Sequence, residues 1–150
     1  MKNPYKKWRE ENVLFLDDGF DCDEAYECLT GAGFKVERFR NHFQREDGGR
    51  EQSVPDPRVI QLCNRHGWLL VTTDSNIVNA HRKEIAECKR LGLVASAHNS
   101  VGNIMEWAVA LVKLKPTMDK NNFKKRERPW HAQFGRDGKF TVGPRSVENR

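Results

Sequence analysis

Residues 68–72 read Trp68-Leu-Leu-Val-Thr72, and Asp74 follows this run two residues later. A continuous apolar run of this length after a glycine, here Gly67, is typical of a strand that is buried on both faces. A second run of the same kind, Val13-Leu-Phe-Leu16, is also followed by an acid, Asp17. Strands buried on both faces belong to parallel sheets that are covered by helices, so the two runs predict an α/β fold.

The sequence around these two runs alternates between further strand and helix signals. Helix-start signals occur at Asp21, at Asp56-Pro57 and at Ser75, and a helix with 3.6-residue spacing follows Ser100. We expect further strands over residues 34–39 and 91–97, and helices from residue 21 to 31, 56 to 66, 75 to 90 and 100 to 115. The order β-α-β-α-β-α-β-α predicts a three-layer α/β/α domain with a central parallel sheet of about four strands.

The last quarter of the chain differs from the rest in charge. Residues 1–112 hold 15 Lys and Arg against 17 Asp and Glu, whereas residues 113–150 hold 11 against 4. The net charge of +5 therefore comes entirely from the C-terminal part. We divide the chain into an α/β domain, residues 1–116, and a basic extension, residues 117–150, with a small hairpin expected over residues 132–142.

Composition limits the function classes. The chain has 150 residues, 37% hydrophobic and 31% charged, which suits one globular domain. No apolar run reaches the roughly 20 residues that a membrane span needs, and no signal peptide is recognised at the N-terminus. Four cysteines match no zinc-binding spacing, so we expect free thiols and a cytoplasmic location.

Three acids are expected at one edge of the sheet. Asp17 follows the first strand, Asp74 follows the third, and Asp56 begins the helix that precedes the third strand. That helix runs antiparallel to the strands, so its N-terminus lies at their carboxyl edge, where ligands of open α/β sheets bind. Asp56 and Asp74 have an alternative role as helix caps, whereas Asp17 has little structural reason to be where it is. We expect further polar residues near this edge: Asp18, Thr72, Asn76, His98 and Asn99.

Clustered carboxylates repel each other unless a cation neutralises them or they share protons. Hard oxygen ligands suit Mg²⁺ or Mn²⁺, which orient a phosphodiester and ease the formation of hydroxide from water. No Cys–His arrangement offers a rival nucleophile, and the sequence has no Gly-rich phosphate loop. The acids therefore favour a hydrolase that acts on phosphodiester bonds. A hydroxyl of Thr72 or Thr73 beside Asp74 is expected to orient the carboxylate of Asp74, and the alternative is that these threonines only end the strand.

Four segments together resemble the PIN-like domains: Phe15-Leu-Asp-Asp18, Val36-Glu-Arg-Phe-Arg-Asn-His-Phe43, Val54-Pro-Asp-Pro57 and Gly67-Trp-Leu-Leu-Val-Thr-Thr-Asp-Ser-Asn-Ile77. The resemblance implies an endoribonuclease that cleaves single-stranded RNA with Mg²⁺ or Mn²⁺, and relatives include toxins of toxin–antitoxin pairs. Carried onto this chain, it makes Asp17, Asp56 and Asp74 the metal-binding acids and Glu84 a further acid. Asn76 stands where relatives often have an acid, which puts a second metal site in doubt.

The basic extension offers a surface for nucleic acid. Cations alternate there with rings, a combination that suits phosphate contacts and base stacking on a single strand. A solvated tail is the alternative interpretation. We expect the contacts with nucleic acid to come from Lys124, Lys125, Arg126, Arg128 and Trp130.

Partners and rival functions stay open at this stage. RNA is the expected substrate without excluding DNA, and an acidic antitoxin protein or a second copy of the chain are further candidate partners. A catalytically silent PIN-like module that only binds RNA is one alternative function. A phospho-receiver domain is another, because receivers also place paired acids after the first strand, as Asp17 and Asp18 are, and carry a late Lys-Pro, as at Lys115-Pro116.

Overall fold

The computed structural model describes residues 13–43, 54–74, 76–96, 104–120, 130–135 and 140–142. These residues form one six-stranded sheet with the strand order β2-β1-β3-β4-β5-β6. The first five strands in this order are parallel to their neighbours, and β6 pairs antiparallel with β5. The strands are β1 (Val13–Leu16), β2 (Lys35–Arg38), β3 (Leu69–Thr72), β4 (Gly92–Ser96), β5 (Trp130–Phe134) and β6 (Phe140–Val142).

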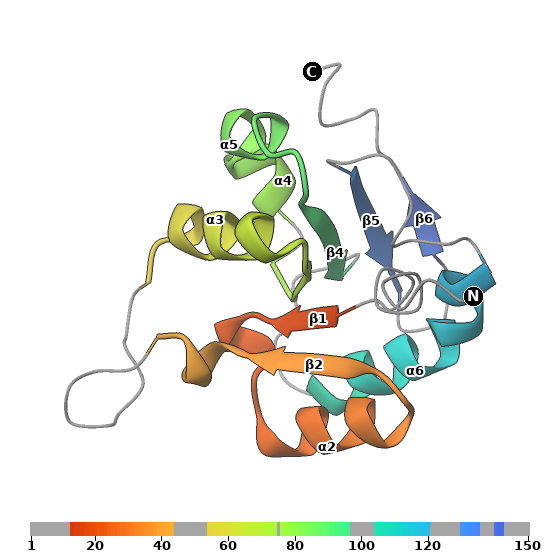
Figure 1. Cartoon of the computed structure of the whole chain (residues 1–150). Helices are drawn as coiled ribbons and strands as arrows, with labels where there is room; N and C mark the ends of the chain where they lie inside the picture. The colour runs from red at the N-terminus through yellow and green to blue at the C-terminus, as the bar shows by residue number, and fades with distance from the viewer. Residues whose placement is uncertain are drawn as a thin grey trace, which may run out of the picture.

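Helices cover both faces of this sheet. The helices α3, α4 and α5 lie on one side of the strands, and α2 and α6 lie on the other (Figure 1). Their bounds are α2 (Asp23–Gly31), α3 (Asp56–His66), α4 (Ile77–Ala80), α5 (Arg82–Ala86) and α6 (Ile104–Lys120), with short 3₁₀ turns at η1 (Asp18–Phe20) and η2 (Phe39–Asn41). The expected three-layer α/β/α fold with a parallel sheet is confirmed, although the sheet has more strands than the four expected.

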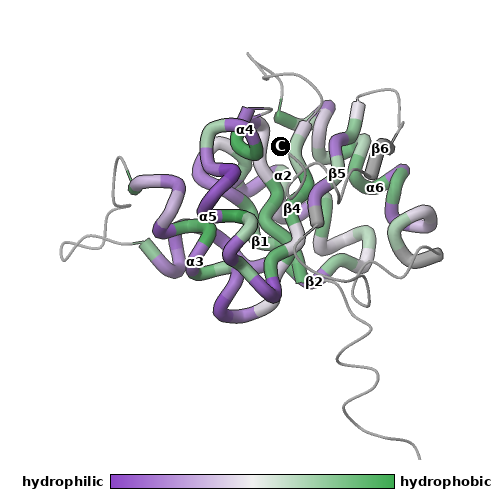
Figure 2. The backbone as a smooth tube through the Cα atoms, turned by 90° about the horizontal axis from the view of Figure 1, so that it is seen from above, coloured by the Kyte–Doolittle hydropathy of each residue, from purple (hydrophilic) through white to green (hydrophobic). Residues whose placement is uncertain are grey.

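The alternation of side chains along each strand divides the interior into two cores. Leu14 and Leu16 of β1 pack in the core beneath α2 and α6, whereas Phe15 between them packs in the core beneath α3, α4 and α5. In the same way Leu69 and Val71 of β3 face one core and Leu70 faces the other. This is why the strands have unbroken apolar runs, and Figure 2 shows them at the hydrophobic centre of the molecule.

Two helices differ from the sequence prediction. The expected helix over residues 75–90 is two short helices, α4 and α5, separated at His81, whose φ of −127° and ψ of 35° are not helical. At the other end, α6 does not stop at Lys115 but continues through Pro116 to Lys120. Leu114 and Met118 are both buried in the core, and their packing retains the last turn despite the backbone hydrogen bond that proline cannot donate.

The C-terminal residues take part in the sheet. The expected hairpin is present as β5 and β6, and β5 pairs in parallel with all five residues of β4. The sheet therefore extends past residue 116, where we divided the chain. Trp130, expected to contact nucleic acid, is the first residue of β5 and pairs with Gly92.

Asp21 does not act as the cap of the following helix, contrary to the sequence prediction. The N-cap of α2 is Cys22, and the Asp21 side chain is fully buried in an ion-pair network. Asp21 Oδ1 accepts a hydrogen bond from Arg38 Nε at 2.6 Å, and Oδ2 accepts one from the backbone N–H of Arg40 at 3.0 Å. Arg38 also pairs with the exposed Asp23 at 2.8 Å. The network ties the segment after β1 to the end of β2.

No helix among the described residues is both long and apolar enough to cross a membrane.

Candidate active site

The central strands β1 and β3 are neighbours, but the chain leaves them in opposite directions across the sheet. From β1 the chain passes outward to β2, and from β3 it passes to β4 on the other side. In open parallel sheets the carboxyl edge at such a reversal forms a crevice where ligands bind. Asp17 follows β1 directly and Asp74 follows β3 by two residues, and the backbone N–H of Asp17 donates to the carbonyl of Val71 at 3.0 Å. The structure therefore places both acids at the reversal point.

A chain of hydrogen bonds joins Asp17, Thr72 and Asp74. The buried Thr72 Oγ1 donates to Asp17 Oδ2 at 2.9 Å and accepts from the backbone N–H of Asp74 at 3.1 Å. Asp74 Oδ1 in turn accepts from the backbone N–H of Asn76 at 2.9 Å. The Thr72 hydroxyl thus orients the carboxylate of Asp17, whereas the sequence had led us to expect a hydroxyl of Thr72 or Thr73 on the carboxylate of Asp74.

Asp17 carries the most perturbed carboxyl group of this edge. Burial raises its pKa above the usual value of 3.8, and the negative charges of Asp56 and Asp18 act in the same direction. Hydrogen bonds from the backbone N–H of Asp18, at 2.9 Å, and from Thr72 oppose this rise. A half-buried carboxylate with two donors and neighbouring negative charges is a group whose ionised form a cation would stabilise.

Asp56 reaches the same edge from α3 but is not a helix cap. The N-cap residue is Pro55, and Asp56 is the first residue of the helix. Its Oδ2 lies 3.1 Å from Nε2 of His81, at the junction of α4 and α5. The negative charge of Asp56 is one of the smaller causes that raise the pKa of Asp17, after burial.

Sequence reasoning missed His81 as a member of this site. The residue lies in the segment that follows Asp74, and such a segment begins at the carboxyl edge of the sheet, close to the N-terminus of α3. A histidine in the segment after Asp74 could therefore have been predicted as a site residue. The prediction of one continuous helix over residues 75–90 prevented this, because His81 was then an ordinary helix residue.

The other predicted site residues have mixed placements. Asp18 is exposed beside Asp17, and Asn76 is the N-cap residue of α4. Glu84 lies in α5, and no described contact joins its carboxylate to Asp17, Asp56 or Asp74; its backbone carbonyl accepts a hydrogen bond from the Cys88 thiol. The remaining predicted residues lie outside the described part of the chain: His98, Asn99, Lys124, Lys125, Arg126 and Arg128.

Within the described ranges, no three His, Cys, Asp or Glu side chains are grouped closely enough to form a ready metal-binding set. This does not conflict with a magnesium ion, because Mg²⁺ keeps several of its waters and is commonly held by only one or two carboxylates. Asp17 and Asp56 supply such hard oxygen donors. The four cysteines are free, and burial raises the pKa of the Cys63 thiol well above its usual value of 9.0, so this thiol is not a nucleophile near neutral pH.

Comparison of the chain with protein-family models, with curated proteins and with solved structures gave no match. The interpretation of the acidic edge therefore depends on its own geometry.

Proposed function

We propose that this protein is a metal-dependent endoribonuclease that hydrolyses phosphodiester bonds of single-stranded RNA, with Asp17, Asp56 and Asp74 as its acidic centre. The observation that carries the proposal is the half-buried carboxylate of Asp17 at the reversal point of the sheet, oriented by Thr72 and subject to the negative charge of Asp56. The resemblance of four sequence segments to PIN-like domains supports the same function. A role as the toxin of a toxin–antitoxin pair is one biological setting for such an enzyme.

The acids have distinct tasks in this proposal. Asp17 and Asp56 would hold Mg²⁺ or Mn²⁺, and Thr72 keeps the Asp17 carboxylate in one orientation. His81 fixes the position of the Asp56 carboxylate through its hydrogen bond. Asp74, held by the N–H of Asn76, lies on the neighbouring strand end, where it can accept a proton from the attacking water. A bound divalent ion supplies charge stabilisation for the scissile phosphate and lowers the pKa of water.

The phospho-receiver interpretation has one observation in its favour. The strand order β2-β1-β3-β4-β5 is one of the two common orders of doubly wound sheets and is shared with receiver domains. The receiver interpretation, however, needs the lysine of Lys115-Pro116 at the same edge of the sheet as Asp17. Lys115 lies in α6 against Gly33 and the Phe34 ring, at the amino end of β2, which is the opposite edge from Asp17. The nuclease proposal has no such conflict.

The decisive experiment is an RNA cleavage assay with the purified full chain. An unstructured RNA oligonucleotide is expected to be cut internally with Mg²⁺ or Mn²⁺ and to stay intact in EDTA. Binding of intact RNA without any cleavage would instead identify a silent RNA-binding module. Transfer of phosphate from acetyl phosphate to Asp74, without cleavage, would identify a receiver.

Metal binding itself predicts a thermal shift that does not depend on activity. At about ten times its Kd, Mg²⁺ stabilises the folded state by roughly 1.4 kcal/mol, which corresponds to a rise in Tm of roughly 3–6 °C for a domain of this size. Because the metal binds the ionised carboxylate, the shift should shrink as the pH falls through the raised pKa of Asp17. Differential scanning fluorimetry from neutral to acidic pH measures it.

The control for this shift is the Asp17→Asn variant, which should melt at the same temperature with and without the metal. A shift of the same size in wild type and variant would place the ion elsewhere on the protein.

A further inference from the structure

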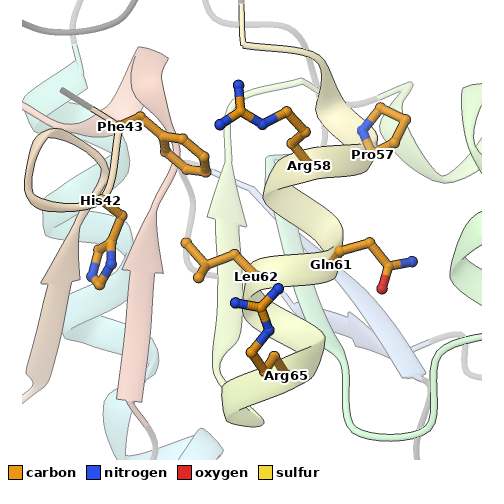
Figure 3. Close-up of a pocket in the computed structure, with 7 residues that line it drawn as sticks. All are labelled: His42, Phe43, Pro57, Arg58, Gln61, Leu62 and Arg65. Atoms are coloured by element: carbon orange, nitrogen blue, oxygen red, sulfur yellow. The ribbon is translucent and has the colours of Figure 1, made fainter. Parts of the chain in front are cut away.

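A groove runs along the outer side of α3, beside the acidic edge. It has a volume of about 460 Å³ and begins at Pro57, the residue next to Asp56. One wall is formed by His42 and Phe43, just after η2, and the other by side chains of α3 (Figure 3). The segment after η2 and the helix α3 therefore enclose the groove, which extends away from the acidic edge along α3.

The α3 wall of the groove is cationic. Arg58, Leu62 and Arg65 are spaced four and three residues apart, so they share one face of the helix, and Figure 3 shows them extending toward His42 and Phe43. The Arg58 guanidinium lies 5.3 Å from the centre of the Phe43 ring. Among the described residues that line the groove none is acidic, although Glu37 binds the ring of His42 from outside at 3.2 Å.

A row of three rings, His42, Trp68 and His66, extends from the groove toward the residue before β3. The His42 ring centre lies 5.2 Å from that of Trp68, and the His66 ring stacks on Trp68 at 4.2 Å with an interplanar angle of 12°. Trp68 stacks in turn on the buried Phe15. His42 and His66, whose rings both contact Trp68, are exposed residues, and His42 lines the groove together with the arginines.

Cations interleaved with flat rings match a single strand of nucleic acid better than an acidic peptide. A peptide does not carry an aromatic ring at every residue, whereas each nucleotide offers one base for stacking and one phosphate for an arginine. Arg58 and Arg65 are separated by about 10 Å along the helix axis, a spacing that serves successive charges along a strand better than a single anion. The groove also begins beside the proposed catalytic acids, so a strand bound there leads into them.

We propose that this groove binds single-stranded RNA on one side of the scissile phosphate, with phosphates on Arg58 and Arg65 and a base against the ring of the exposed His42. The inference rests on the proposed nuclease function, because it assigns the path of the substrate to the same site. It adds a binding surface within the α/β body that is made of other residues than the basic residues 124–128.

The test measures RNA binding in EDTA, so that its outcome does not depend on cleavage. With a fluorescent unstructured RNA, the double substitution Arg58→Ala and Arg65→Ala is expected to weaken binding about 10-fold or more and to lower the salt-dependence slope by about 1 to 1.5. Lys113→Ala, an exposed cation of α6 in the opposite helix layer, serves as the control and should leave both quantities near wild type.

A second measurement covers the case in which the double variant is misfolded. Photocrosslinking of the wild-type chain with RNA that contains 4-thiouridine should label the peptides that hold His42 and Phe43 or Arg58 to Arg65. Unchanged affinity in a folded double variant, labels confined to other peptides, or no binding of RNA by wild type would each overturn the inference. If the variant binds weakly while wild type never cuts RNA, the groove assignment stands and the nuclease proposal fails.

Discussion

The Asp17→Asn variant is expected to cut RNA about 100- to 1,000-fold more slowly than wild type, because charge stabilisation by a bound metal is worth several kcal/mol and each 1.36 kcal/mol is a factor of ten in rate. Two hydrogen bonds fix the orientation of the Asp17 carboxylate, since Thr72 Oγ1 and the backbone N–H of Asp18 both donate to it. An asparagine fills the same space and retains an oxygen that can accept from Thr72, so the fold should persist. Initial cleavage rates at saturating metal measure the loss.

Two companion measurements make this result specific. RNA affinity in EDTA should stay within a few-fold of wild type for Asp17→Asn, since the proposed strand-binding groove lies on α3. Glu27→Gln removes an exposed negative charge from α2 and should leave the cleavage rate unchanged. Full cleavage by the Asp17→Asn variant would show that this edge of the sheet is not the catalytic centre.

The largest expected loss of stability comes from Asp21→Asn, at about 3 kcal/mol, because removing the buried partner of an ion pair leaves the Arg38 charge with only the exposed Asp23 beside it. The Asp21 side chain is fully buried, and Arg38 is only 13% exposed. The amide can keep one accepting oxygen but turns two donor hydrogens toward groups that themselves donate. Urea unfolding should give the difference directly, and the Tm should fall by roughly 6–12 °C for a domain of this size.

Asp23→Asn is the matched control for this measurement. Asp23 pairs with the same two arginines, but its side chain is 67% exposed, and exposed ion pairs contribute little to stability. Equal losses for Asp21→Asn and Asp23→Asn would mean that the network is not held by the buried carboxylate.

The fold class was predictable because each strand and helix can be recognised from its own short stretch of sequence. The apolar runs at Val13–Leu16 and Leu69–Thr72 are strands since both of their faces are buried, and helix signals between strands require parallel crossovers. What the sequence could not show was where β5 and β6 would pair. A hairpin can be recognised from its own residues, but its place beside β4 depends on contacts with a strand far away along the chain.

The candidate site was predictable only as a convergence of acids. Topology alone brings Asp17, Asp56 and Asp74 to one edge, and the structure places them there. The specific contacts depend on side-chain geometry that spacing does not encode. The Thr72 hydroxyl could serve either neighbouring acid, and it bonds to Asp17, which is 55 residues away. His81 reaches Asp56 because the helix breaks at that residue, a feature that the hydrophobic periodicity of residues 77–88 did not reveal.

The pairing of β5 with β4 has a consequence for how the basic C-terminal residues can be studied. All five residues of β4 are buried, and β5 covers its outer hydrogen-bonding edge. A polypeptide ending at residue 116 would lack this cover and also the last turn of α6 with Met118. Its exposed apolar edge would be a template for strand addition between molecules, and aggregation would then be mistaken for lost RNA binding. Neutralising single lysines and arginines beyond residue 116 keeps the sheet intact and isolates the contribution of charge.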